Sequence, residues 1–76
     1  MKNLVNNIES PFLFVKGNIS IRMANHNGVI MYTKERIVVS TKPYAIEFEG
    51  KDLEIKQYSK EEMEIIGEIQ LIRYCV

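Results

Sequence analysis

The 76-residue chain has few of the residues around which small proteins build cross-links or metal sites. It contains one cysteine, one histidine and two prolines, and its ten basic and ten acidic side chains leave no formal net charge. A single cysteine excludes an internal disulfide framework and indicates a reducing compartment. A structural zinc site needs four ligands, drawn mostly from cysteine and histidine. We therefore expect no metal and no other cofactor.

Long hydrophobic runs are also absent. No segment approaches the ~18 apolar residues that a membrane-spanning helix needs, and no apolar stretch with a cleavage site follows Lys2. We expect a cytoplasmic protein with no direct membrane insertion, whose membrane contact, if any, goes through a partner. The balanced charge gives no global attraction to nucleic acid. A chain this short is one domain at most and leaves no room for a deep active-site cavity.

The chain is rich in β-branched residues that follow an alternating pattern. Isoleucine and valine outnumber leucine and alanine, and branching at Cβ suits a pleated strand. Apolar residues with a period of two predict half-buried antiparallel strands. The strands are expected at residues 12–16, 19–25, 29–33, 36–41, 44–49, 52–57, 62–66 and 68–74. The predicted fold is all-β, with residues 1–11 as a short leader and residues 12–76 as a single small domain.

The residues between these runs have the chemistry of tight turns. Asn27-Gly28 suits a type I′ hairpin, and Gly17-Asn18 and Gly50-Lys51 place glycine first, as type II′ requires. Lys42-Pro43 and Thr33–Arg36 predict two further turns. Short loops make successive strands neighbours, which predicts a meander. Eight strands in so short a chain must curl into a barrel-like or two-layer sheet to bury one face.

Two segments allow a helix. Ser59 and Glu62 have the spacing of a capping box, so Lys60–Ile66 could be a short helix that Gly67 ends; alternatively, Gly67 is a bulge in one long strand from Glu62 to Tyr74. The first ten residues have Leu4, Val5 and Ile8 at helical spacing before Pro11.

The alternation also predicts which side chains are buried. The expected core is Ile19, Ile21, Ile30, Tyr32, Ile37, Val39, Ile46, Phe48, Leu53, Ile55, Met63, Ile65, Ile69 and Leu71. Glu47 and Glu49 should line the solvent side of their strand. Residues 1–44 carry six basic and two acidic groups, and residues 45–76 carry four basic and eight acidic groups. These opposite charges either support association with another molecule or pair across strands within one molecule.

Candidate catalytic residues are scarce. His26 and Cys75 are formally a nucleophile pair, but no third residue is placed to orient them. We interpret His26 as a turn residue and Cys75 as a terminal apolar thiol, and we expect no enzyme.

Three stretches, in order, resemble the YabP/YqfC family of sporulation proteins. The first is residues 25–37, in which Asn25, His26, Gly28, Tyr32 and Arg36 match family positions; the others are residues 46–55 and residues 59–74. The resemblance spans about residues 17–74, although Asn27 stands where the family usually has a basic residue. It implies a small β-rich protein of endospore-forming Firmicutes that acts in the mother cell, in assembly around the forespore. It implies no catalytic activity and no established binding residues.

These observations lead to two main hypotheses. The first is a non-enzymatic protein that acts in spore assembly through contacts with protein partners of that machinery. It would use the sheet edges, with Phe12 and Phe14 on the first strand and Ile72 and Tyr74 on the last, covered by a second copy or by a partner's strand. The alternative is a small nucleic-acid- or ligand-binding β-module, in which Phe12, Phe14 and Tyr32 stack on bases. An enzyme subunit whose active site lies on another chain is a third, weaker hypothesis.

Overall fold

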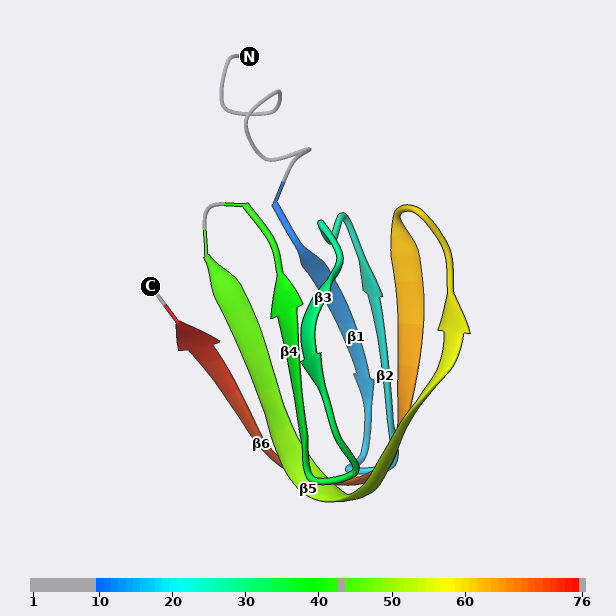
Figure 1. The fold of residues 1–76 in the computed structure, drawn as a ribbon. Helices are drawn as coiled ribbons and strands as arrows, with labels where there is room; N and C mark the ends of the chain where they lie inside the picture. Colours follow the sequence, from blue (N-terminus) through cyan, green and yellow to red (C-terminus); the bar gives the residue numbers. More distant parts are fainter. Residues whose placement is uncertain (1–9, 43, 76) are drawn as a thin grey trace.

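The residues that the structure describes form one antiparallel sheet of six strands (Figure 1). A computed structural model describes residues 10–42 and 44–75. The strands are β1 (Phe12–Lys16), β2 (Ser20–Ala24), β3 (Val29–Tyr32), β4 (Arg36–Ser40), β5 (Ala45–Tyr58) and β6 (Glu62–Cys75). The all-β prediction is confirmed. The described ranges contain no helix long and apolar enough to cross a membrane. Of the predicted leader, residues 1–11, only residues 10 and 11 are described. The apolar residues at helical spacing, Leu4, Val5 and Ile8, lie outside the described residues.

The prediction of eight strands is wrong, because four of them are halves of two long strands. Residues 44–49 and 52–57 belong to β5, and residues 62–66 and 68–74 belong to β6. Gly50-Lys51 is therefore not a hairpin turn. The capping-box helix is also wrong: Ser59 Oγ accepts a hydrogen bond from the Glu62 N–H at 3.1 Å, but this closes the β5–β6 turn. The alternative of one long strand with an irregularity at Gly67 is confirmed.

The strand order is β1-β2-β6-β5-β4-β3, which is not a meander. The segment after β2 does not turn back to make a hairpin with β3; it crosses to the other side of the long β5–β6 hairpin. Asn25 N–H donates to the Glu61 carbonyl at 2.7 Å, and Asn27 N–H donates to the Ser40 carbonyl at 2.7 Å. The positive φ angles fall on Asn25 (64°) and Gly28 (107°). The predicted type I′ turn at Asn27-Gly28 is therefore wrong.

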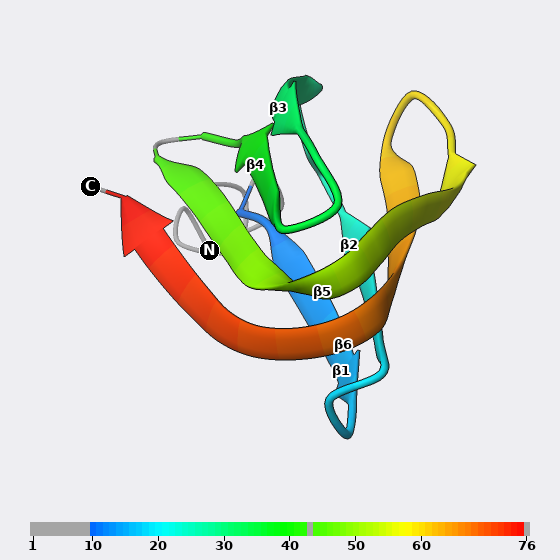
Figure 2. The same ribbon diagram turned by 60° about the horizontal axis from the view of Figure 1, so that its bottom comes forward.

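The two long strands bend together and curl the sheet, as Figure 2 shows. The first half of β5, residues 45–49, pairs with β4, and the first half of β6, residues 62–66, pairs with β2. The bend brings the β1–β2 end of the sheet to face the β3–β4 end. The edge strands β1 and β3 do not pair with each other. The sheet is therefore curled but not closed into a barrel.

The bend depends on two glycines that let the backbones of β5 and β6 approach closely. A Cβ atom on Gly50 would lie 1.9 Å from the Glu68 carbonyl oxygen, and one on Gly67 would lie 2.6 Å from the Asp52 carbonyl oxygen. The pairing register shifts between Lys51 and Glu54, where Asp52 has a φ of 53°. Bulges of this kind bend a strand and increase its twist. Glycine is needed here for space inside a strand, not for a turn.

The core lies on the inner face of the curled sheet and draws on β2, β4, β5 and β6. Its buried side chains are Ile21, Met23, Ile37, Val39, Ile46, Phe48, Leu53, Met63, Ile65 and Ile69. All but Met23 were predicted. Ile19, Ile30 and Tyr32 were wrongly predicted, because they are 57%, 64% and 50% exposed. Ile19 lies in the β1–β2 turn, and Ile30 lies at a register shift on the edge strand β3. Ile55 and Leu71 are half-buried.

We predict that Gly50→Ala strongly destabilises the fold, because the new methyl group would overlap the backbone of β6. The matched control is Gly17→Ala, where a Cβ meets nothing within 4 Å and φ is 54°. That control should lower the free energy of unfolding by only about 1–2 kcal/mol, because alanine is strained in the left-handed region of backbone conformation. Urea unfolding followed by circular dichroism measures both variants. Equal losses of stability in the two would contradict the close-approach role of Gly50.

Candidate protein-interaction edge

Strand β1 is an edge strand with one side open. All five of its residues pair with β2, from Phe12 opposite Ala24 to Lys16 opposite Ser20. No other described strand pairs with β1. Within the described residues, its outward N–H and C=O groups therefore have no strand beside them. Such an open row is a template for pairing unless charge, proline, a bulge or a covering segment blocks it.

The side chains of β1 are apolar on both faces of the sheet. Phe12 and Phe14 lie on the outer face and are 65% and 70% exposed, with ring centroids 6.3 Å apart. On the inner face, Leu13 packs against the core and Val15 is 51% exposed. A strand that is apolar on both faces and open on one side is unusual on a monomer surface, and an apolar surface of this kind is typical of interaction sites.

The other edge strand, β3, is better protected. It has four residues, and its register with β4 shifts between Val29 and Met31. Tyr32 turns toward β5, where its hydroxyl accepts a hydrogen bond from the Ile55 N–H at 2.9 Å. The Lys34 carbonyl accepts a second bond, from the Leu53 N–H at 2.8 Å. These contacts tie the β3–β4 hairpin to β5, while a bulge discourages pairing with another chain.

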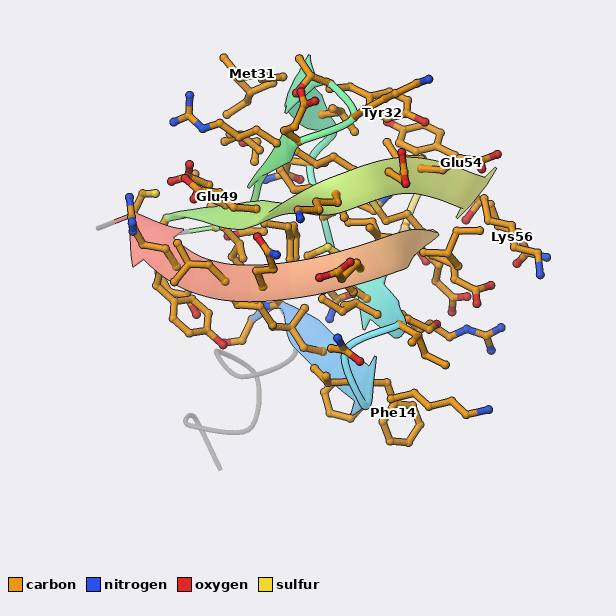
Figure 3. The ribbon with its side chains drawn as sticks, turned by 90° about the horizontal axis from the view of Figure 1, so that it is seen from below. Phe14, Met31, Tyr32, Glu49, Glu54 and Lys56 are labelled. Carbon is orange, nitrogen blue, oxygen red and sulfur yellow. The ribbon has the colours of Figure 1, made fainter. Side chains whose placement is uncertain are left out.

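The aromatic residues of the nucleic-acid hypothesis do not come together. Phe12 and Phe14 lie on β1, whereas Tyr32 lies on β3, at the opposite edge of the sheet. Figure 3 shows Phe14 and Tyr32 at opposite ends of the molecule. A continuous platform for stacked bases requires neighbouring rings, and this arrangement does not provide one.

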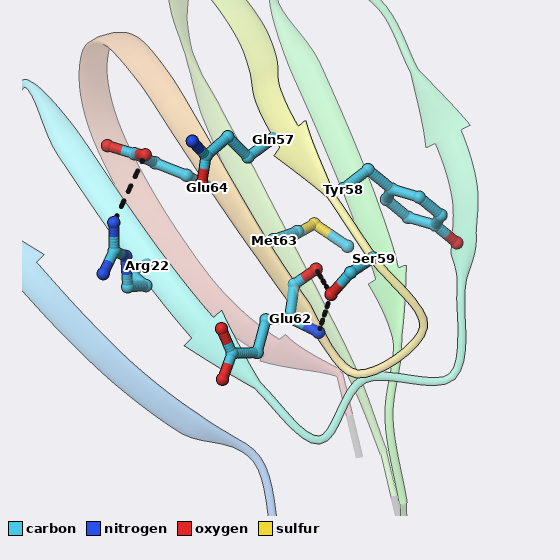
Figure 4. A pocket seen from close by; sticks show the side chains of 7 residues that line it. All are labelled: Arg22, Gln57, Tyr58, Ser59, Glu62, Met63 and Glu64. Atoms are coloured by element: carbon cyan, nitrogen blue, oxygen red, sulfur yellow. Dashed lines mark hydrogen bonds and ion pairs between the residues drawn. The ribbon is translucent and has the colours of Figure 1, made fainter.

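The outer face beside β1 carries a small pocket and an ion pair. Arg22 Nη2 lies 3.7 Å from Glu64 Oε1, and Ser20 Oγ donates to the Glu64 carboxylate at 3.2 Å. A pocket of about 330 Å³ lies next to this pair (Figure 4). It is lined by Arg22, Gln57, Tyr58, Ser59, Glu62, Met63 and Glu64. Arg22 belongs to the basic part of the sequence and Glu64 to the acidic part, so these charges pair within one molecule.

The Ser59 hydroxyl in this pocket is bonded to backbone atoms and, among the described residues, to no side chain that could act as a general base. Ser59 Oγ bonds to the backbone of Glu62. His26 approaches Ser59, but its Nε2 lies 2.9 Å from the carbonyl oxygen, not from the hydroxyl. A nucleophile needs its base within hydrogen-bond reach. The contact between His26 and Ser59 is therefore structural.

His26 ties the segment between β2 and β3 to the β5–β6 turn. Its Nδ1 accepts a hydrogen bond from the Gly28 N–H at 2.9 Å, so Nε2 carries the proton and donates to Ser59. The ring is 5% exposed and lies 5.1 Å from the Tyr58 ring, centroid to centroid. Asn25 Nδ2 donates to the Ser10 carbonyl at 2.9 Å. These two residues, with Gly28, hold the crossing segment between β2 and β3.

The other two family-motif residues lie elsewhere. Tyr32 contacts β5, as described above, and Arg36 on β4 donates to the carboxylate of Glu47 on β5. The five matching positions therefore do not form one binding site.

Glu47 is a feature that the alternating pattern missed. It lies on the face away from the core, as predicted, but it is only 2% exposed. Arg36 from β4 and Arg73 from β6 cover it, the latter with Nη1 3.4 Å from Oε1. The hydrogen bond from Arg36, together with the positive charges of Arg36 and Arg73, lowers the pKa of Glu47. Arg36, Glu47 and Arg73 come together only through the pairing register of β4, β5 and β6, which the sequence pattern does not give.

The predicted edge residues of the last strand have a different setting from Phe12 and Phe14. β6 lies in the middle of the sheet order, and its N-terminal half, residues 62–66, is paired on both sides. Its C-terminal half pairs with β5 alone among the described strands. Ile72 lies opposite Phe48 and packs against the core. Tyr74 packs edge-on against Tyr44 with centroids 5.5 Å apart.

The described residues contain no group of three or more potential metal ligands. Cys75 is a free, exposed thiol.

Comparison with known proteins finds one family. The model of the YabP family matches residues 9–75, which is nearly the whole chain. No curated protein and no solved structure matches the chain.

We predict that His26→Phe destabilises the protein although it keeps a ring in place. The change leaves the Gly28 N–H and the Ser59 carbonyl without their partner, at about 1–3 kcal/mol for each group that stays buried. Asn27→Ala is the matched control, since Asn27 is exposed in the same segment. Thermal or urea unfolding compares the two. A His26→Phe variant as stable as the control would show that the crossing segment does not need this ring.

We also predict that acid weakens the fold through Glu47. Its pKa is lowered in the folded state, so its stabilisation is complete above the ordinary glutamate pKa and is lost as the pH falls through the folded-state value. Urea midpoints measured from neutral to acidic pH should therefore fall more steeply for the wild type than for Glu47→Gln. Parallel pH profiles would contradict this role.

Proposed function

The chain belongs to the YabP family, and from this membership we propose that it has a role in sporulation and acts there through protein–protein contacts. The family is not a known enzyme family. The proposed setting is the mother cell, in spore assembly at the forespore surface. The single observation that supports a contact-based function is the open edge of β1 with its exposed Phe12 and Phe14.

The chemistry of the described residues agrees with this proposal. Three of the polar side chains that line the pocket make structural bonds: Ser59 bonds to the turn, and Glu64 pairs with Arg22 and accepts from Ser20. By contrast, the phenylalanine rings of β1 remain largely exposed, and the adjacent backbone row is open. An added strand would bond to that row and cover both rings, which is the usual mode of β-augmentation. We propose that this edge is the surface through which the protein works.

The test is complementation in an endospore former whose own copy of the gene has been deleted. We expect wild type and Ile30→Lys to restore the yield of heat-resistant spores, and Phe14→Lys to leave it near that of the deletion strain. Both lysines replace exposed apolar residues on edge strands, at 70% and 64% exposure. Immunoblotting confirms equal amounts of each variant. Normal spores with Phe14→Lys would refute a function at β1, and a deletion strain with unimpaired sporulation would refute the role itself.

A further inference from the structure

We propose that the strand covering β1 is the β1 strand of a second copy, so that two molecules join edge to edge in a symmetric dimer. This inference rests on the proposed function, because it identifies the partner at the same edge. The observations that carry it are the open backbone row, the apolar character of both faces of β1, and the position of its single charge.

The chemistry of β1 restricts what can lie beside it. A strand added to this edge places alternate side chains on the two faces of the sheet. On the outer face its neighbours are Phe12 and Phe14; on the inner face they are Leu13 and Val15, of which Leu13 packs against the core. The incoming strand must therefore be apolar on both faces. The run Phe12–Val15 meets this requirement itself, so a second copy satisfies both edges at once. A two-fold axis gives such a self-complementary contact.

The alternation of β1 limits the register of an antiparallel pair. The outer residues of one copy must meet the outer residues of the other, and all five residues of both strands pair only if Phe14 lies opposite Phe14 of the second copy. Leu13 then lies opposite Val15, and Phe12 lies opposite Lys16. The four phenylalanine rings form one cluster across the axis. Aromatic pairs stabilise an interface by more than the apolar area that they bury accounts for.

The positions of Lys16 and the phenylalanine rings favour the antiparallel over the parallel arrangement. In the antiparallel register the two lysines lie at opposite ends of the interface, and each ammonium group lies beside a Phe12 ring, a favourable cation–π arrangement. In a parallel pair of the same two edges, the two-fold axis would run along the strands and exchange the faces of the sheet, so the phenylalanine rings of the two copies would lie on opposite faces and could not cluster. Like charges directly opposite are unfavourable, so Phe14→Lys is disruptive in the antiparallel pair, where it places two lysines face to face on the axis.

The choice of β1 over β3 also has a structural basis. The bulge in β3 and the inward turn of Tyr32 interrupt the regular row that edge pairing requires. Lys16 stands at the end of β1, next to the turn, and the four residues before it carry no charge, bulge or proline. A head-to-tail contact between β1 and β3 would build open filaments, whereas the β1–β1 contact closes as a dimer.

Sedimentation velocity of the full chain at several concentrations is the first experiment. We expect a dimer for the wild type, a dimer for Ile30→Lys, and a folded monomer for Phe14→Lys, with circular dichroism confirming the fold. A monomeric wild type would overturn the proposal. So would species larger than a dimer that Ile30→Lys abolishes, because they would indicate contacts through β3.

Disulfide trapping tests the register directly. In a Cys75→Ser background, Phe14→Cys should cross-link to its counterpart under mild oxidation, because opposed residues in antiparallel strands have Cα atoms about 4.5–5.5 Å apart, within disulfide range. Phe12→Cys is the matched control; the two copies of residue 12 would lie about 14 Å apart and should not cross-link. Equal or faster cross-linking through residue 12 would overturn the proposed pairing.

The two proposals fail in different ways. If the wild type is a monomer and Phe14→Lys still abolishes spore formation, the edge functions with a different partner and the dimer is wrong. If Phe14→Lys dissociates the dimer and spores form normally, the dimer exists and the function proposed for this edge is wrong.

Discussion

The fold depends on the close approach of two backbones inside the β5–β6 hairpin. Gly50 and Gly67 lie where a Cβ atom would meet the backbone of the opposite strand. Without that approach the hairpin would be a long, gently twisted ribbon, and the two ends of the sheet would not face each other. The bend therefore creates the inner face on which the core forms. It also allows one hairpin to pair with β4 along one half and with β2 along the other.

A second set of contacts keeps the two ends of the curled sheet together. His26 spans from the Gly28 N–H to the Ser59 carbonyl, and the backbone of the same segment bonds to Glu61 and Ser40. The Tyr32 hydroxyl makes an equivalent link from β3 to β5. Three of the five residues that match the family pattern thus hold the curled shape: Asn25 and Gly28 provide the positive φ angles, and His26 provides the polar link. Their role in this structure is architectural.

The two strands at the ends of the sheet order, β1 and β3, are edges of different character, and this asymmetry is the basis for the proposed function. One edge, β3, is short, irregular and tied inward. The other, β1, is regular and apolar, with its exposed rings beside an open row of backbone groups. Because the sheet does not close, the two edges cannot satisfy each other. Among the described residues, no strand covers this edge or its two largely exposed phenylalanines, which is why the proposal places the partner there.

The sequence by itself determined the residues that alternate and the class of fold. Ile46 and Phe48, and likewise Met63 and Ile65, are buried as their period of two predicts, because alternation is set by the pleat of a single strand. The turn at Thr33–Arg36 was also predictable, since its bonds are made within four residues. The ordered family residues were sufficient to identify the family. All of these are properties of neighbouring positions along the chain.

Only the tertiary structure decided the rest, because it depends on contacts between residues far apart in the sequence. A glycine can be needed for a turn or for lack of space around its Cα atom. At Gly50 it is needed for space, because the backbone of Glu68 on β6 lies where a Cβ atom would be. Glu47 is buried because Arg36 and Arg73 lie on the strands either side of it. Ile19 and Ile30 fit the local pattern but lie at a turn and at an irregular edge, where the core does not reach. Strand order, and with it the identity of the open edge, follows from which halves of β5 and β6 the short strands join.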